Sequence, residues 1–341
     1  MAVIDFALVE ASFSAAAHSY EQAATVQQQM ALQLATAVAP VLRHEGHYRI
    51  LEIGSGPGNF TQTLLQQINL MAKSNAAHVT LDLVCNDLSA SLLKLTMSKV
   101  QQWMPAADAP AARTSAAVAG TEVPAAGAGA GLPAVVAGTG ELAAEASAGA
   151  GAGISVLHCQ QVTGNVLQAQ TLEQLHSCGP FDLIVSNAVF QWFPHLDKSL
   201  QTLQTLLSPQ GYLAFSSFAH GTLAELKAIC GEEHGLRYLS GREGKEALLA
   251  AGLLPCYWAQ ERVQHYFSSA REVLRHLKHT GVNALSRERF SVREMRALLQ
   301  RYEERFSHQQ GVVLSWCPYM VVAQKQQRHS SKADICGVRS A

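Results

Sequence analysis

Short apolar runs alternate with helical stretches along this 341-residue chain, and this alternation restricts the fold more than any other feature. Such short apolar runs fit strands that are buried on both faces of a sheet. Strands that alternate with helices indicate βαβ units and a parallel sheet. We expect strands at 48–53, 79–85, 155–160, 181–186 and 211–218, and helices at 20–42, 61–72, 89–103, 196–207 and 222–234.

The pattern changes toward the carboxyl-terminal part of the chain. Strand-like runs at 256–267 and 312–323 flank helices near 269–280 and 291–305. This order predicts an antiparallel pair that closes one edge of the sheet.

Residues 105–153 differ from the rest of the chain in composition. The segment is mostly Ala and Gly, has no helical or strand period and contains no aromatic residue. Such a segment cannot bury enough apolar area to offset its conformational entropy, so we expect a disordered insert. A functional lid is the alternative. We expect the polar tail 326–341 to be disordered as well. A single folded domain is then built from 1–104 and 154–325.

Charge and composition argue against several classes of function. The net charge of −1 does not suit a broad nucleic-acid surface, which needs a basic excess. No apolar run is long enough to span a bilayer, and the N-terminal stretch, with an acid inside it and no basic start, is a poor signal peptide. Seven widely spaced cysteines without a CxxC pair predict reduced thiols in a cytoplasmic protein, with neither a disulfide framework nor a metal site.

The first expected strand runs directly into a glycine-rich loop, ILEIGSGPGNF at 50–60. Three glycines alternate there, and an acid precedes the first of them by two residues. Glycines let the backbone turn sharply and let a ligand approach it without Cβ contact. The spacing is the pattern of S-adenosylmethionine (SAM) binding, whereas a dinucleotide fingerprint would need glycine in place of Asn59. A plain tight turn is the alternative. The candidate cofactor-binding residues are Glu52, Gly54, Gly56 and Gly58.

Two further strand ends carry polar residues. LDLVCNDLS at 81–89 ends a strand at Asp87, whose carboxylate can hold both ribose hydroxyls, since ligands of open α/β sheets bind beyond the carboxyl ends of strands. Capping of the next helix is the alternative. After the third strand, Asn165 can accept from an adenine amino group while a neighbouring backbone N–H serves a ring nitrogen; a turn residue is the alternative. The candidate cofactor-binding residues here are Asp87, Leu88, Asn165 and Val166.

The stretch SNAVFQWFPHL at 186–196 has a polar pair and a group of rings where the fourth strand ends. This end lies across from the glycine loop in a parallel sheet, so the pair Ser186 and Asn187 is expected to face the cofactor, with backbone carbonyls and the Asn187 amide holding the amino-acid end of SAM. The rings that follow would wall the methyl-transfer site. We expect Gln191 and Trp192 to serve the substrate site, and the two neighbouring phenylalanines to pack on the sheet.

The strings LEIGSGPGNF, NDLS and FDLIVSNAVFQWFPHLDKSLQTLQTLLSPQGYLAFSSF resemble the class I SAM-dependent methyltransferases over about 50–220, apart from the insert. A narrower resemblance is to the malonyl-[acyl-carrier protein] O-methyltransferases, which start biotin synthesis. It is carried by FSAAAHSYEQAATVQQQMALQL, FAHGTLAEL and SAREVLRHLKHTGVNAL. The chain departs from that family in its Ala/Gly insert, in a last strand that follows the family loosely, and in Asn165, where such families often have aspartate.

The resemblance implies a Rossmann-like class I methyltransferase fold, in which a mostly parallel seven-stranded sheet has helices on both faces and an antiparallel edge pair. It implies SAM as the cofactor, held by Gly54 and Gly56 and, at the ribose, by Asp87. It also implies that Tyr20 lies over the cofactor and the substrate, with His18 as a second candidate for the acceptor carboxylate. The implied reaction moves a methyl group to the free carboxylate of malonyl-[acyl-carrier protein], giving the methyl ester that primes pimeloyl and biotin synthesis.

A carboxylate is already ionised at neutral pH, so this reaction needs no general base and no metal. Because a carrier protein is acidic, its docking site should be basic. Arg271, Arg275 and Lys278 fall on one face of the helix expected at 269–280 and are the candidate docking residues. An ordinary solvated face is the alternative. We expect no nucleic-acid or membrane partner.

Other functions stay open at this point. A methyltransferase of another small carboxylate of the aconitate type, or of a quinone precursor, would show the same cofactor motifs. A non-catalytic protein with the SAM fold would be expected to lose either the glycine loop or Asp87. Dinucleotide-dependent oxidoreduction is disfavoured by Asn59.

Overall fold

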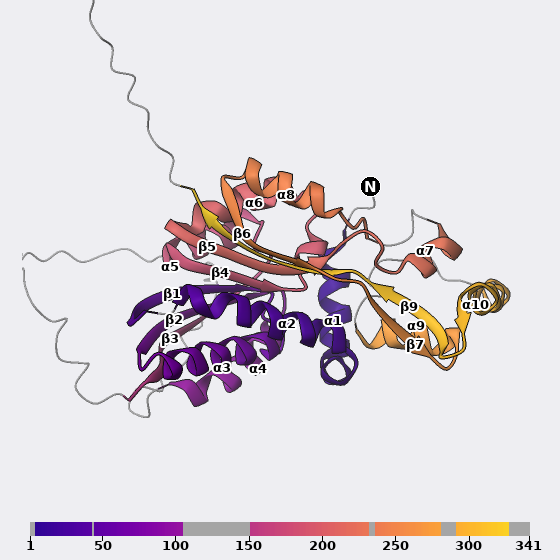
Figure 1. The fold of residues 1–341 in the computed structure, drawn as a ribbon, viewed down its shortest axis with the longest axis horizontal. Coiled ribbons are helices and arrows are strands. Elements are labelled where there is room, and N and C mark those ends of the chain that lie inside the picture. The colour runs from indigo at the N-terminus through magenta and orange to yellow at the C-terminus, as the bar shows by residue number, and fades with distance from the viewer. Residues whose placement is uncertain (1–3, 43, 105–150, 232–235, 281–290, 327–341) are drawn as a thin grey trace, which may run out of the picture.

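A seven-stranded sheet forms the centre of the protein (Figure 1). The computed structural model describes residues 4–42, 44–104, 151–231, 236–280 and 291–326, of which 16–22 are described for their backbone only. The strand order is β3-β2-β1-β4-β5-β10-β6. The first five of these strands run parallel, and β10 runs antiparallel to β5 and β6. The predicted fold class is therefore confirmed. The strands are β1 Gly46–Ile53, β2 His78–Asp87, β3 Gly153–Thr163, β4 Phe181–Asn187, β5 Leu207–Phe218, β6 Leu253–Gln260 and β10 Pro318–Lys325.

Helices cover both faces of the sheet, because successive strand residues point to opposite sides. Ile50 and Leu183 pack with α2, α3 and α4, whereas their neighbours Leu51 and Ile184 pack with α5, α6 and α8. Figure 1 shows these two helical layers on either side of the sheet. The helices are α2 Thr25–Val38, α3 Asn59–Ser74, α4 Ala90–Val100, α5 Ala169–Cys178, α6 Leu196–Leu203 and α8 Gly241–Ala250, with the 3₁₀ turns η2 Gln101–Trp103, η3 Phe190–Trp192 and η4 Gln204–Leu206.

A smaller antiparallel sheet, in the order β7-β9-β8, continues beyond one end of the central sheet. It forms because two long apolar runs each pass from one sheet into the other: β6 leads into β7, and β9 leads into β10 through Cys317 alone. Helices α7, α9 and α10 pack around it. The elements are β7 Val263–Phe267, β8 Ser307–His308, β9 Gly311–Trp316, α7 Ala224–Cys230, α9 Ala270–His279 and α10 Val292–Phe306.

Several boundaries differ from those that the sequence predicts. The runs 256–267 and 312–323 are not single strands, since each is divided between two sheets. The helix predicted over 20–42 is instead α1 Phe6–Ala23, α2 and the 3₁₀ turn η1 Ala39–Leu42, because Ala24 leaves the helical region at φ −86° and ψ 48°. Gly153, the last residue assigned to the insert, already belongs to β3.

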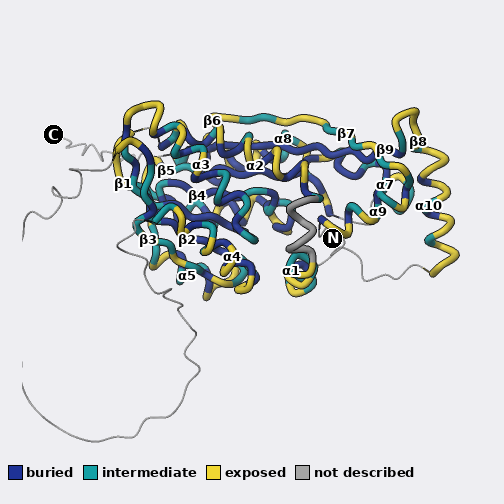
Figure 2. Tube along the Cα trace, turned by 90° about the horizontal axis from the view of Figure 1, so that it is seen from below, coloured by how far each residue is buried: buried dark blue, intermediate teal, exposed yellow. Residues whose placement is uncertain are grey.

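Helix α8 is not foreseen by the sequence analysis, although it begins with a capping box between Ser240 and Glu243. The predicted insert, apart from 151–153, and the tail from 327 lie outside the described residues. Figure 2 shows that β2, β4, β5 and β10 of the central sheet are mostly buried, while the edge strand β6 and helix α10 are more exposed. Within the described part of the chain, none of the helices has the length and apolar character needed to cross a bilayer.

Candidate functional site

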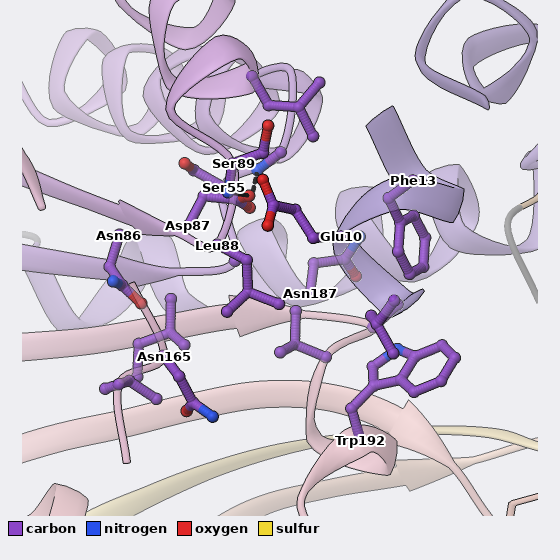
Figure 3. A pocket seen from close by; sticks show the side chains of 18 of the residues that line it. Glu10, Phe13, Ser55, Asn86, Asp87, Leu88, Ser89, Asn165, Asn187 and Trp192 are labelled. Carbon is purple, nitrogen blue, oxygen red and sulfur yellow. Dashed lines mark hydrogen bonds between the residues drawn. The ribbon is translucent and has the colours of Figure 1, made fainter. Parts of the chain in front are cut away.

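A cavity lies beyond the carboxyl ends of β1, β2 and β4, where motifs from separate parts of the chain meet (Figure 3). The loop after β3 adds to its lining, and α1 forms a wall. The cavity thus occupies the position in which open α/β sheets bind their ligands. It brings together most of the predicted cofactor and catalytic residues, namely Gly54, Gly56, Asp87, Leu88, Asn165, Val166, Asn187 and Trp192.

The three glycines of the loop have positive φ angles, but they do not serve the same purpose. A Cβ on Gly58 would lie 2.8 Å from the Cα atom of Thr96 in α4, and a Cβ on Gly54 would overlap the Val189 side chain. A Cβ on Gly56 would meet no heavy atom within 4 Å, and Gly56 lines the cavity. Two of the glycines therefore allow close packing, and Gly56 leaves space for a ligand. Gly58 itself does not line the cavity.

Asp87 connects the glycine loop to the start of α4. Its Oδ2 accepts from the backbone N–H of Gly56 at 2.8 Å, and its Oδ1 accepts from the backbone N–H of Ser89 at 2.9 Å. Burial raises the pKa of Asp87, and these two hydrogen bonds oppose the increase. Both predicted roles fit this geometry: the carboxylate supports the next helix, and each oxygen keeps a further lone pair for a ligand in the cavity.

Two asparagines shape the cavity on the β3 side. Asn165 accepts at Oδ1 from the backbone N–H of Leu167 at 3.0 Å, so it is a turn residue as well as a lining residue. Asn86 donates from Nδ2 to the carbonyl oxygens of Val162 and Gly164, at 2.9 and 3.0 Å. Sequence reasoning missed Asn86, although it stands directly before Asp87 at a strand end.

The two polar residues at the end of β4, Ser186 and Asn187, have different surroundings. The Ser186 hydroxyl donates to the carbonyl oxygen of Ile53 at 2.8 Å and is fully buried, so it joins the ends of β4 and β1 and does not line the cavity. Asn187 does line the cavity. Its Nδ2 donates to the carbonyl oxygen of Gln27 in α2 at 3.1 Å, and its Oδ1 accepts from the Ser216 hydroxyl at 2.5 Å. The Ser186 side chain therefore does not face the cavity, and of the predicted pair only Asn187 lines it.

The rings after β4 also separate into two groups. Phe190 stacks on Phe215 with ring centroids 4.0 Å apart, and Phe193 lies 4.9 Å from Phe190, so both pack on the sheet as predicted. Phe193 in addition reaches the cavity lining. Trp192 is 5% exposed, lines the cavity and meets Phe13 of α1 edge to face at 5.8 Å. Gln191 lines a second, smaller cavity that adjoins the first at Trp192.

Glu52 lies behind the cavity and does not line it. Its Oε2 accepts from the Thr61 hydroxyl of α3 at 2.6 Å, and its Oε1 has no partner among the described residues. Burial raises its pKa to about 7, and the nearby charge of Asp87 adds to the increase. The side chain therefore joins β1 to α3 beneath the glycine loop, which differs from the predicted direct contact with the cofactor.

Helix α1 supplies a wall of the site that sequence reasoning missed. Phe6, Val9, Glu10 and Phe13 line the cavity at the spacing of one helix face. The Glu10 carboxylate points toward Asp87 across the cavity (Figure 3), and its charge contributes to the raised pKa of Asp87. The side chains of Tyr20 and His18, the predicted catalytic and substrate residues of this helix, lie outside the described part of the structure.

The predicted docking residues lie away from the cavity, on α9. Arg271, Arg275 and Lys278 are all exposed, and Arg275 forms an ion pair with Glu272 on the same helix. Helix α9 packs against α1, so this surface adjoins the cavity wall. Among the residues that the structure describes, no three His, Cys, Asp or Glu side chains lie close enough together to hold a metal ion.

Several curated proteins are similar to this chain in sequence. Malonyl-[acyl-carrier protein] O-methyltransferases from Calditerrivibrio nitroreducens and Chlorobium phaeovibrioides are 32% and 37% identical to this chain, over 154 and 150 residues. These alignments cover 45% and 44% of this chain but only 61% and 56% of the relatives. The Haemophilus ducreyi protein of the same name is 25% identical over 96% of this chain and 99% of its own.

Solved structures of similar fold include the YcgJ protein from Bacillus subtilis, which is 11% identical, with a TM-score of 0.45 over 86% of this chain and 99% of that one. A family model described as a methyltransferase domain matches residues 23–287. Since that match includes the glycine loop after β1, the strand ends at Asp87 and Asn165, and the rings after β4, the chain belongs to the methyltransferase-domain family.

Proposed function

We propose that this protein transfers a methyl group from SAM to the free carboxylate of malonyl-[acyl-carrier protein]. The observation that carries the proposal is the cavity between Gly56, Asp87 and Trp192, in a chain whose curated relatives bear this name. The product would be the malonyl methyl ester that, in the family resembled, primes pimeloyl and biotin synthesis.

The residues of the cavity fit SAM. Gly56 leaves open space where any other residue would project a side chain into the cavity. Asp87 offers oxygens for two ribose hydroxyls, Asn165 and Val166 adjoin the place for an adenine ring, and Asn187 offers an amide to the amino-acid end. When bound, SAM supplies a methyl group on a positively charged sulfonium.

The acceptor carboxylate is ionised at neutral pH, so the chain need not supply a general base. Its task is to hold two reactants in line and to keep water away from them. The edge-to-face pair of Trp192 and Phe13 supplies an apolar wall for this purpose. Opposite charges on the reactants disappear during the transfer, so a site that excludes water favours the reaction over bulk solvent.

The carrier protein is the larger part of the proposed substrate, and it is acidic. Arg271, Arg275 and Lys278 offer it positive charge on α9, next to the helix that walls the cavity. Electrostatic attraction of this kind speeds association more than it strengthens the final complex. We therefore propose this face of α9 as the docking surface.

Mass spectrometry of malonyl-carrier protein, after incubation with this protein and SAM, tests the proposal. We expect a gain of one methyl group, which is absent with acetyl-carrier protein and is lost in the Asp87→Ala variant. Asp82→Ala is the matched control, because Asp82 lies on the same strand and outside the cavity.

Calorimetric titration with SAM accompanies each assay. If SAM binds but the malonyl group gains no methyl, the malonyl assignment is wrong. Free small carboxylic acids and quinone precursors would then be the acceptors to test.

A further inference from the structure

The second cavity extends the first toward the small sheet. Phe13, Ala188 and Trp192 line both cavities, and the walls of the second include Phe218 and Trp316. Its volume is about 20 Å³, which is room for roughly one water-sized group. Ala188, at the junction, has a φ of 56°, a conformation that is costly for a residue other than glycine. The chain thus holds a strained residue in the wall that the two cavities share.

Two polar side chains of the second cavity, those of Gln191 and Thr280, are paired with protein groups, and Gln27 and Tyr238 line it as well. Gln191 donates from Nε2 to the carbonyl oxygen of Ala188 at 2.6 Å and accepts at Oε1 from the Ser217 hydroxyl at 3.2 Å. The Thr280 hydroxyl donates to the carbonyl oxygen of Leu277 at 3.1 Å. These hydrogen bonds hold the Gln191 and Thr280 side chains in place beside the cavity.

The indole N–H of Trp316 differs from them. It is buried and has no acceptor among the described residues, and the side chain is only 1% exposed. The ring is fixed by Phe218 and His276, at centroid distances of 5.2 and 6.3 Å. An indole nitrogen can only donate, so the missing partner must carry an acceptor atom. A buried donor without a partner is unfavourable, and because Trp316 lines a cavity, the oxygen of a ligand in that cavity can supply the missing acceptor.

We propose that the Trp316 indole N–H donates a hydrogen bond to the thioester carbonyl oxygen of the malonyl acceptor, an inference that rests on the function proposed above. The acceptor carboxylate has to reach the methyl group in the first cavity. The thioester carbonyl is one methylene away from that carboxylate, and Trp316 lines the second cavity but not the first. A carbonyl oxygen is also of the size that the second cavity admits.

This contact gives Trp316 a part in substrate choice. A β-carboxy thioester places a carboxylate and a carbonyl at the two ends of one methylene and can fill both cavities. A carboxylate on a plain alkyl chain leaves the indole N–H buried and unpaired, so it should be a poorer acceptor. Trp316 would then distinguish malonyl from a carboxylate of similar size without the carbonyl.

The test compares two acceptors on the carrier protein: the malonyl thioester, and the 2-carboxyethyl thioether, in which a methylene replaces the carbonyl. We expect wild-type protein to favour the malonyl group by about tenfold in kcat/KM, and Trp316→Phe to lose this preference, while the affinity for SAM is unchanged. Trp103→Phe is the matched control. Its indole N–H is also buried without a partner among the described residues, and it lines neither cavity.

If Trp316→Phe keeps the wild-type preference between the two acceptors, the inference is wrong and the proposed function stands. If wild-type protein methylates neither acceptor, the proposed function fails and the inference fails with it. Because Trp316 is large and buried, the Phe variant can fail to fold. Replacement of Trp316 by benzothienylalanine, which keeps the ring shape but lacks the N–H, then gives the same comparison.

Discussion

Glu52 lies beneath the glycine loop with one oxygen bonded to Thr61 and the other without a partner among the described residues. Burial raises its pKa from an ordinary value of 4.5 to about 7. The folded protein therefore binds a proton there at pH values at which the unfolded chain has released it. Stability from this proton is fully present below about pH 4.5 and is lost as the pH rises through about 7.

Replacing Glu52 by glutamine should remove this pH dependence, since the amide stays neutral and can still accept from Thr61. We expect Glu52→Gln to be more stable than wild-type protein at pH 8, by up to about 3 kcal/mol, and nearly equal to it at pH 4.5. Urea unfolding at both pH values measures the difference. Burial also lowers the pKa of His276 to about 4. Its titration changes the free energy of unfolding of both proteins by the same amount, so it does not affect the difference between them. A constant difference between the two proteins across this range would contradict the prediction.

Gly56 and Gly58 allow a comparison between ligand space and packing within one loop. Alanine at either position must adopt a positive φ, which costs about 1 kcal/mol or more. At Gly58 the added Cβ also meets the backbone of Thr96, so we expect Gly58→Ala to lose about 2–4 kcal/mol of stability. Gly56→Ala should lose less stability but about tenfold or more of the affinity for SAM, because its Cβ would project into the cavity. Denaturant unfolding and calorimetry check the two effects, and equal losses in both variants would refute the distinction.

At the scale of elements, α1 has a role that its sequence conceals. One face of α1 carries Phe6, Val9, Glu10 and Phe13, so an acidic residue lies among apolar ones. From the sequence alone this pattern indicates an imperfect amphipathic helix. In the structure this face lines the cavity, which accounts for the acidic residue on it: Glu10 points toward Asp87, and Phe13 packs on Trp192 (Figure 3). The mixed face of α1 thus matches a helix that lines a cavity with polar and apolar parts.

Helix α9 should carry the electrostatic part of substrate binding. The double variant Arg271→Glu with Lys278→Glu reverses exposed charge on one face, so we expect the KM for malonyl-carrier protein to rise about tenfold, with little change in kcat for a malonyl thioester that lacks the protein. The difference should shrink at high salt. Steady-state kinetics at two ionic strengths measure it.

Lys198→Glu with Arg242→Glu is the matched control for this prediction. Both side chains are exposed. They lie on α6 and α8, which cover the face of the central sheet opposite to the face covered by α2, α3 and α4. An equal rise in KM in this control would mean that net charge, and not the face of α9, governs association.

For the whole molecule, the parallel part of the fold follows from the sequence because its central strands contain short apolar segments that end in polar residues. Strand β4 illustrates this, since Leu183 and Ile184 enter opposite cores and the segment 183–185 is apolar throughout. The division of β9 from β10 does not follow, because the apolar pattern continues through Cys317, where the chain passes from the small sheet to the central one.

The site was predictable to a similar degree. Loop spacing and strand ends identify Gly56 and Asp87, since their chemistry is local to one segment. The role of Ser186 depends on its neighbour in the sheet, Ile53, which is distant in the sequence. The unpaired N–H of Trp316 likewise appears only when the small sheet is placed beside the rings after β4. Contacts between distant segments are what the sequence patterns leave undetermined.

The Ala/Gly segment between α4 and β3 provides a prediction for the whole molecule. Strand β3 pairs with β2 from Gly153 onward, and the Gly153 N–H donates to the carbonyl oxygen of Ala77 at 2.9 Å. These contacts fix the start of β3 directly after the segment. Helix α4 ends in the turn η2 before the segment begins. Because composition predicts that 105–150 forms no packed core, these residues should be dispensable for the fold.

Replacing 106–149 by a flexible Gly/Ser linker of about eight residues should therefore leave SAM affinity and the rate of methyl transfer within about twofold of wild type. Loop-closure entropy depends only weakly on length, so a shorter loop should raise the free energy of unfolding slightly or leave it unchanged. Calorimetry, urea unfolding and the carrier-protein assay measure these quantities on the same two proteins. Loss of transfer with SAM binding and stability intact would show that the segment acts on the acceptor, and the single-domain interpretation would then have to include it.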